Sequence, residues 1–220
     1  MWEELEPGMF ALGHVGLTWG GAVLLVEVAR RLPDRRDAAG HRGRIDLDYR
    51  FVILGSLLPD LLDKPLGVYL FPEALGSGRA FGHSLLFLAL LAGSALVLRG
   101  SWRRALASTA FGCAVHLPLD RLWAEPETLA WPLLRRTAPP EDVQGWAGQM
   151  LQLLAADPLV YMPEIVGGVI VTALAALLLR RGGARELLRS GRLSFGRTPR
   201  LGAGQQRPHQ LQRGHGTAER

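Results

Sequence analysis

The chain has 220 residues, 48% of them hydrophobic, and a formal net charge of +5, and its length fits a single domain. Long apolar runs alternate with arginine clusters up to residue 180, whereas residues 181–220 contain almost no apolar run. This distribution argues against a water-soluble domain and predicts a polytopic helical membrane protein with a disordered end. The single cysteine, Cys113, excludes an intrachain disulfide.

Two apolar segments begin the chain. Residues 9–29 (MFALGHVGLTWGGAVLLVEVA) are long enough to cross about 30 Å of hydrocarbon at about 1.5 Å per residue. The acidic start before them lacks the features of a signal peptide, so we expect this segment to remain in the mature protein. Residues 51–62 (FVILGSLLPDLL) are short and interrupted by Pro59, which predicts a broken or partly inserted helix buried among the others.

Three further segments follow. Residues 81–98 and 160–179 have the length and apolar character of membrane spans. Residues 105–122 are less apolar and carry His116 and Asp120, which is tolerable in a membrane only if that face looks into the helix bundle. We therefore predict an all-α domain over residues 1–180 with about four to five membrane-embedded helices, and a disordered Arg/Gly/Gln-rich tail over residues 181–220.

Arginine placement predicts the orientation of the helices. Arginines cluster between the first and second segments, between the third and fourth, and directly after the fifth. Short arginine-rich loops stay on the cytoplasmic side, so we expect an extracytoplasmic N-terminus and a cytoplasmic tail in an inner-membrane protein. A basic tail that follows a membrane span fixes orientation or contacts anionic lipid, and no nucleic-acid partner is expected.

Six side chains that could bind metal fall at the predicted outer ends of these segments. Residues spaced three or four apart share one helix face, as do two pairs in this set. Nitrogen and carboxylate donors together suit Zn²⁺ first, with Mn²⁺ or Fe²⁺ as alternatives, and predict one or two divalent ions per chain. The predicted ligands are His14, Asp60, Asp63, His83, His116 and Asp120.

Each of these motifs taken alone also has a structural interpretation. Asp60 and Asp63 resemble a helix-capping arrangement. His116 can be a buried histidine satisfied by a neighbouring carboxylate, and a lone histidine near the end of a span, such as His14 or His83, is more often a packing residue. The convergence of all the candidates at one side of the membrane favours a metal site.

Two other polar residues lie near the predicted cluster. Arg79 precedes His83 by four residues and is suited to hold a substrate phosphate beside the metals. Glu164 near the outer end of the last span is either a further ligand or general base, or an interfacial residue.

These residues, in this order, resemble the YdjM-like family of predicted membrane-bound metal-dependent hydrolases. The resemblance covers about residues 10–135 and is carried by short motifs, although Gly78 stands where the family typically has a histidine. The pattern is also loosely similar to the zinc-dependent phospholipase C and nuclease group, which implies a phosphoesterase. The motifs are His14, Gly55-Ser56-Leu57-Leu58-Pro59-Asp60 with Asp63, Arg79, Gly82-His83-Ser84-Leu85-Leu86, and His116-Leu117-Pro118-Leu119-Asp120 followed by Trp131-Pro132-Leu133.

The sequence therefore predicts a membrane hydrolase in which metal-activated water attacks a phosphoester of membrane lipid or of the envelope. Asp63, Asp120 and Arg79 are the candidate catalytic residues. One alternative is a divalent-metal transporter or metal-sensing membrane protein, although transport sites usually lie near the midplane of the membrane. Another is a structural membrane protein whose polar residues only bridge helices.

Overall fold

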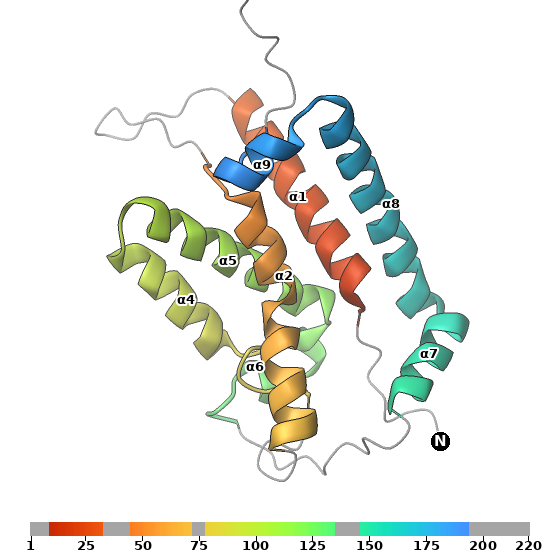
Figure 1. The fold of residues 1–220 in the computed structure, drawn as a ribbon. Helices are drawn as coiled ribbons and strands as arrows, with labels where there is room; N and C mark the ends of the chain where they lie inside the picture. The colour runs from red at the N-terminus through yellow and green to blue at the C-terminus, as the bar shows by residue number, and fades with distance from the viewer. Residues whose placement is uncertain (1–8, 33–44, 72–77, 135–145, 194–220) are drawn as a thin grey trace, which may run out of the picture.

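A computed structural model of the chain describes residues 9–32, 45–71, 78–134 and 146–193. The regular elements within these ranges are helical (Figure 1). The long helices are α1 (Ala11–Arg31), α2 (Tyr49–Lys64), α4 (Leu85–Val97), α5 (Gly100–Leu119) and α8 (Pro158–Arg180). The shorter elements are the π-helix η1 (Pro65–Leu70), the 3-10 helix η2 (Leu122–Ala124), α6 (Pro126–Leu129), α7 (Trp146–Ala156) and α9 (Ala184–Ser190).

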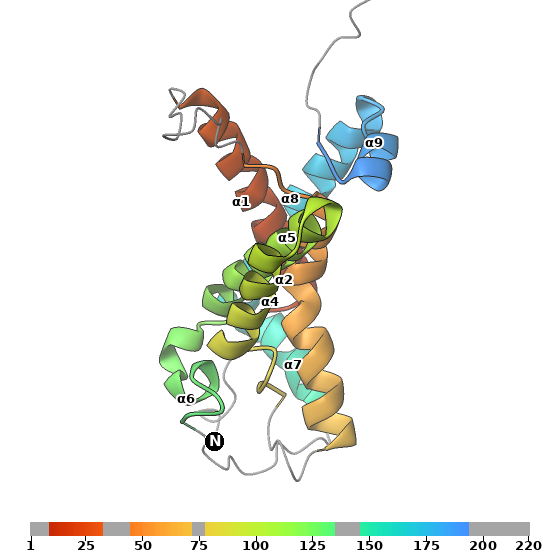
Figure 2. The same cartoon turned by 90° about the vertical axis from the view of Figure 1, so that its left-hand side faces the viewer.

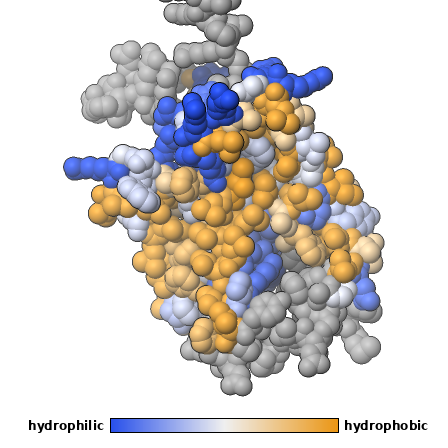
Figure 3. Space-filling view, in the orientation of Figure 1, coloured by the Kyte–Doolittle hydropathy of each residue, from blue (hydrophilic) through white to orange (hydrophobic). Residues whose placement is uncertain are grey.

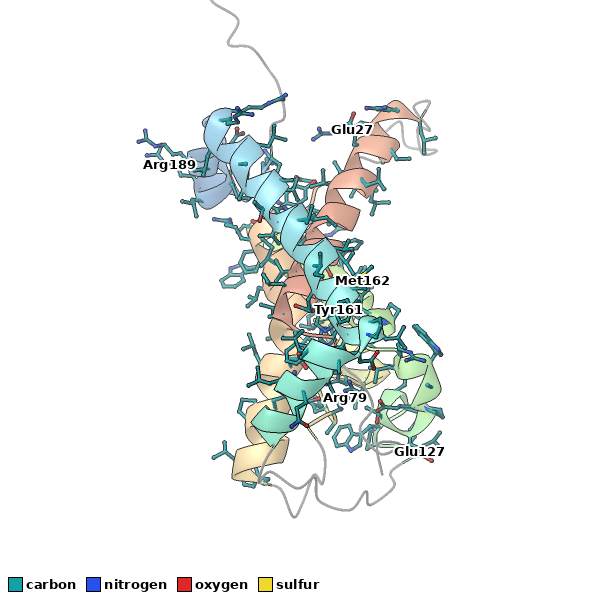
Figure 4. The ribbon with its side chains drawn as sticks, turned by 90° about the vertical axis from the view of Figure 1, so that its right-hand side faces the viewer. Glu27, Arg79, Glu127, Tyr161, Met162 and Arg189 are labelled. Carbon is teal, nitrogen blue, oxygen red and sulfur yellow. The ribbon has the colours of Figure 1, made fainter. Side chains whose placement is uncertain are left out.

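Helix α2 stands in the middle of the molecule, between two groups of helices (Figures 1 and 2). On one side it packs against α5, and α5 in turn packs against α4. On the other side it contacts α1, which packs along α8. Helices α1 and α8 cross and then diverge toward the end that carries Glu27 and Arg189, whereas Arg79 lies toward the opposite end (Figure 4).

Glycine pairs set the two closest helix crossings. A Cβ atom on Gly55 of α2 would meet the backbone of Thr109 in α5, and a Cβ atom on Gly112 of α5 would meet the backbone of α2. Gly16 of α1 and Gly167 of α8 face each other in the same way. Small residues at such positions let helix backbones approach closely, so these glycines fix the spacing of both pairs.

Pro59 does not break α2. It lies inside a continuous helix that ends at Lys64, and η1 follows without a gap. A proline removes the backbone hydrogen bond to the residue four positions earlier, here Gly55. The thiol of Cys113 in α5 donates to the Gly55 carbonyl at 3.3 Å and so satisfies the oxygen that Pro59 leaves without a donor. The predicted second segment is therefore longer than expected, because a neighbouring helix compensates the proline.

The third predicted segment is shorter than expected. Helix α4 has 13 residues and begins at Leu85, whereas the apolar run begins at Phe81. The Ser84 hydroxyl accepts a hydrogen bond from the Phe87 amide at 3.1 Å and caps the helix. The residues before it therefore stay outside the helix, which leaves the backbone around His83 free to bond elsewhere.

The described residues contain two helices that are long and apolar enough to cross a membrane, α1 and α8, with mean hydropathies of 1.4 and 2.1. Helix α8 exposes about half of its apolar residues, among them Ile165 and Val169. Apolar side chains form a broad band across the face in Figure 3, and hydrophilic ones gather above it. A crossing by all four or five segments stays a prediction.

The tail that was predicted to be disordered from residue 181 contains a docked helix, α9. The Tyr49 amide donates to the Gly191 carbonyl at 2.8 Å, and the Arg50 guanidinium donates to the Leu188 carbonyl at 2.8 Å. Arg104 donates to the Ser190 carbonyl. These contacts tie α9 to the start of α2 and to α5. Residues 194–220 of the predicted tail lie outside the described residues.

Asp48 holds this end of the molecule together. Its carboxylate accepts hydrogen bonds from the Arg50 side chain at 2.7 and 3.0 Å and lies 3.4 Å from Arg104. Burial opposes ionisation of Asp48, but the hydrogen bond and charge of Arg50 and the charge of Arg104 outweigh it and hold the pKa below 3.8. The carboxylate therefore stays ionised at neutral pH and stabilises the junction of α2, α5 and α9.

Candidate metal centre

The predicted ligands come from the ends of four helices. Asp60 and Asp63 lie in the last turn of α2, and His83 lies just before α4. His116 lies in the last turn of α5 with Asp120 as its C-cap. His14 lies in the first turn of α1. Because α1 and α4 begin where α2 and α5 end, the six side chains meet at one end of the bundle.

Four of the six form a compact group: Asp60, His83, His116 and Asp120 each offer one ligand atom, and these atoms lie within 4.8 Å of one another. The two Nε2 atoms of His83 and His116 are 3.2 Å apart. Each of them lies 3.6 Å from Asp120 Oδ2, and His83 Nε2 lies 3.5 Å from Asp60 Oδ1. The donor atoms of a tetrahedral zinc site with bonds of about 2.0–2.1 Å lie about 3.3 Å apart. The spacing of the group therefore fits a single small cation.

The outer nitrogens of both histidines are held by acceptors. His83 Nδ1–H donates to Asp63 Oδ2 at 2.8 Å, and His116 Nδ1–H donates to the Ser56 carbonyl at 2.8 Å. In a neutral imidazole only one nitrogen carries a proton, so these bonds direct the lone pairs of both Nε2 atoms toward each other. When both rings are neutral, the two facing lone pairs repel, and either a proton on one Nε2 or a metal ion held by both removes the conflict. Orienting bonds of this kind accompany most histidine ligands of metals.

Asp63 lies beside the group of four. Its Oδ2 accepts from the amides of Ala80 and His83 at 2.7 and 3.1 Å as well as from the His83 ring, and its Oδ1 accepts from the Gly82 amide at 2.8 Å. Both oxygens are thus engaged with the loop that precedes α4. The geometry places Asp63 where it fixes the position and the tautomer of His83.

His14 stacks on the ring of His116, with the ring centroids 4.0 Å apart. Its Nε2 lies 2.9 Å from Asp120 Oδ1, which also accepts from the Met9 amide at 3.2 Å. Both ring nitrogens of His14 are buried and make no hydrogen bond among the described residues, so the contact of Nε2 with Asp120 is a close approach only. Asp120 therefore presents one oxygen to the group of four and the other to His14.

Arg79 lies at the rim of the group. Its guanidinium pairs with Glu125 at 2.5 Å and lies 3.5 Å from Asp120 Oδ2. The carboxylates joined to the site by ion pairs are Asp60, Asp63, Asp120 and Glu125, and the cations are Lys64 and Arg79. Among the residues that the structure describes, four acids against two cations leave an excess of two negative charges when the histidines are neutral. A buried excess of this size is costly unless it is compensated, and one divalent cation would compensate it.

An unpartnered ligand atom also fits a metal. Asp60 Oδ1 is buried and has no hydrogen-bond partner among the described residues, although it faces His83 Nε2. Buried carboxylate oxygens are rarely left without a partner. Together with the facing imidazoles and the charge excess, this oxygen makes the residues a good fit for a divalent ion.

Sequence reasoning missed several contributors to the site. Ser56 offers a backbone carbonyl, which no side-chain pattern reveals. Lys64 follows Asp60 by four residues on one helix face and lies 2.8 Å from Asp60 Oδ2, a spacing that could have identified it. Glu164, left open between ligand and interfacial residue, accepts a hydrogen bond from the Gly13 amide at 3.0 Å and joins α8 to the first turn of α1.

Comparison with protein families gives one result that bears on this site. The family described as YdjM inner membrane protein matches residues 9–185. The chain belongs to the YdjM family. The match includes every residue of the group of four, so the group belongs to the family domain and not to an added segment. Comparison with the curated proteins and with the solved structures gives no match. Membership of this inner membrane protein family agrees with the two apolar helices α1 and α8. Within the matched residues, the structure has a group of four side chains that could hold a metal ion.

Proposed function

We propose that the protein is a membrane-bound, metal-dependent hydrolase that cleaves phosphoesters. The observation that carries the proposal is the pair of buried imidazoles whose Nε2 atoms face each other at 3.2 Å while both Nδ1 atoms donate elsewhere. Two imidazoles with two carboxylates suit Zn²⁺, with Mn²⁺ or Fe²⁺ as alternatives. A divalent ion bound there would make water a nucleophile at neutral pH and stabilise charge on a phosphoryl oxygen.

The side chains around the ion have different roles. His83, His116, Asp120 and Asp60 hold the ion. Asp63 orients His83 through the ring hydrogen bond, as outer-shell carboxylates commonly do. This position supports an orienting role for Asp63 more strongly than direct ligation or catalysis.

His14 and Arg79 act on either side of Asp120. His14 Nε2 faces Asp120 Oδ1, which suits a group that exchanges a proton through that carboxylate. Arg79 lies beside Asp120 Oδ2 and stays the candidate for a contact with substrate phosphate, which an arginine can bind with two parallel hydrogen bonds.

The expected substrates are lipid headgroups or envelope phosphoesters. The site lies at one end of the bundle, near the ends of four helices, and the arginines of α9 lie toward the other end (Figure 4). Arginine-rich ends stay on the cytoplasmic side, so we assign the site to the extracytoplasmic surface. An enzyme there meets phosphoesters at the membrane surface rather than at the midplane, where transport sites usually lie.

Metal analysis and a hydrolysis assay test the proposal. Detergent-purified wild-type protein should contain about one equivalent of metal per chain and hydrolyse a chromogenic phosphodiester. His116→Ala should lose both, while His41→Ala, a histidine outside the predicted ligand set, should keep both. Wild-type protein without metal, or His116→Ala with normal metal content and activity, would refute the proposal. Bound metal without hydrolysis, together with uptake of that metal in proteoliposomes, would point instead to a transporter.

A further inference from the structure

The candidate metal centre is buried at its histidines and more exposed toward Lys64. His83 and His116 are fully buried, and the side chain of Asp120 is 3% exposed. Exposure rises to 13% at the Asp60 side chain and to 39% at Lys64. Asp60 and Lys64 form one exposed edge of the group of four, and Arg79 with Glu125, whose side chains are 15% and 22% exposed, forms another.

Each of these exposed edges carries one cationic side chain, Arg79 or Lys64. The two differ in the number of ion-pair partners that they have. Arg79 already pairs with Glu125 and lies near Asp120, and its side chain is only 15% exposed. Lys64 has one ion-pair partner in the part of the chain that the structure describes, Asp60 Oδ2 at 2.8 Å. An ammonium group carries three donors, so the pair with Asp60 does not use all the donors of Lys64.

Lys64 is also chemically distinct from every other cation of the chain. It is the only lysine among 25 lysine and arginine residues. Lysine presents a compact charge on a flexible stem, whereas arginine presents a rigid planar fork. A flexible ammonium at the entrance can keep Asp60 in place and still turn toward a tetrahedral oxyanion, which has no single planar edge to match.

We propose that Lys64 binds the anionic phosphoryl group of the substrate at the entrance to the site, an assignment that rests on the proposed hydrolase function. The ligand is a phosphate group that carries negative charge, either in a soluble ester or in a lipid headgroup. Lys64 holds one oxygen of this phosphoryl group beside Asp60, at the edge of the group of four. Lys64 is thus a substrate-binding residue that makes the site prefer anionic phosphoesters.

Because the chain has a single lysine, acylation of that side chain is a direct probe of ligand binding. The zinc-loaded protein is treated with an N-hydroxysuccinimide ester, and the peptide that contains Lys64 is quantified by mass spectrometry. Inorganic phosphate at ten times its dissociation constant occupies about nine-tenths of the sites and should slow the labelling of Lys64 about tenfold. An Arg103→Lys protein places a second amine at an exposed position near the start of α5, and the labelling of that amine should not change.

A second arm of the labelling experiment identifies the source of the phosphate. Nanodiscs of phosphatidylglycerol are compared with nanodiscs of a neutral glycolipid, both without soluble phosphate. Protection of Lys64 in the phosphatidylglycerol discs alone indicates a lipid headgroup, and protection by inorganic phosphate alone indicates a soluble ester. Equal labelling of Lys64 under all these conditions would overturn the proposal.

Substitution separates substrate binding from a merely structural role. Lys64→Met should lower kcat/KM for an anionic phosphodiester about 10-fold or more, as the loss of a hydrogen bond to a charged group does, chiefly through KM. It should lower the hydrolysis of a neutral phosphotriester by a much smaller factor. Lys64→Arg should recover part of the loss, and Arg103→Met at the opposite end should behave as wild type.

Metal content distinguishes the possible failures. If Lys64→Met lowers zinc affinity and affects both substrates equally, the residue only holds Asp60 and the inference is wrong, while the proposed hydrolase stands. If wild-type protein binds no metal and hydrolyses neither substrate, the proposed function itself fails.

Discussion

Asp63 provides the sharpest test of the geometry around the candidate metal centre. Asp63→Asn keeps the shape of the side chain but replaces one acceptor oxygen with an NH2 donor. Three hydrogen bonds converge on Oδ2, from the Ala80 amide and from the amide and ring of His83, and one reaches Oδ1, from the Gly82 amide. The asparagine should therefore keep its oxygen at the Oδ2 position and turn its NH2 group toward the Gly82 amide.

The size of the effect follows from these bonds. One buried amide without an acceptor costs about 1–3 kcal/mol of folding free energy. The neutral side chain also polarises the His83 ring less, and loss of an outer-shell partner typically lowers metal affinity about 10- to 100-fold, or about 1.4–2.8 kcal/mol of binding free energy. We expect Asp63→Asn to bind zinc measurably but weakly, whereas His83→Ala should abolish binding.

Competition with a chelator measures both affinities in detergent-purified protein. The matched control is Glu27→Gln, which removes an exposed carboxylate paired with Arg30 and Arg31 at the other end of α1 and should leave zinc affinity unchanged. Wild-type affinity in Asp63→Asn would refute an orienting role. Loss of zinc as complete as in His83→Ala would mean that Asp63 is itself a ligand.

Three further predictions concern stability. In a thermal unfolding assay, Gly112→Ala should destabilise the fold by about 1–3 kcal/mol, because the new Cβ would meet the backbone of α2. The control Gly93→Ala, where nothing lies within 4 Å, should be neutral or slightly stabilising. Equal effects of the two substitutions would contradict the tight α2–α5 crossing. Asp48→Asn should lower stability at neutral pH by about 1–2 kcal/mol. Because the pKa of Asp48 in the folded protein lies below 3.8, its contribution to folding free energy is present above pH 3.8 and is lost as pH falls through the lower folded pKa. The difference in stability between Asp48→Asn and wild type should therefore disappear in acid. A difference that does not change with pH would contradict the role of Arg50. Removal of metal with a chelator should lower the melting temperature, since an ion at 100 times its dissociation constant adds about 2.7 kcal/mol to the free energy of unfolding. An unchanged melting temperature in wild-type protein would argue against a bound ion.

The sequence predicted the helical class and the positions of the main helices because apolar length is a local property. Residues 9–29 and 160–179 are continuous apolar runs, and the structure forms α1 and α8 over nearly the same residues. The boundaries near the site were harder to predict. Helix α2 continues through Pro59 because Cys113 of another helix compensates the proline, and no local signal in α2 reveals this partner.

Helix α9 shows the same limit at the other end of the chain. Its short, arginine-rich sequence has no apolar run and was assigned to the tail. It is nevertheless helical, because Arg50, Arg104 and the Tyr49 amide bond to the carbonyls of its last turn and of Gly191. Distant side chains and one distant backbone amide thus supply the donors that the last carbonyls of a seven-residue helix lack.

The sequence by itself determined that histidines and aspartates stand at the ends of apolar segments, since that pattern depends only on which residue types occupy which positions. Only the tertiary structure separated the group of four that could hold a metal ion from the residues that orient it. Asp60, His83, His116 and Asp120 converge, while Asp63 engages the loop before α4 and His14 stacks behind His116. The sequence could not make this separation because a side chain can bind a metal ion only if its lone pair points toward the ion. That direction is fixed by hydrogen bonds such as the one from His116 to the Ser56 carbonyl, which joins residues 60 positions apart in the chain.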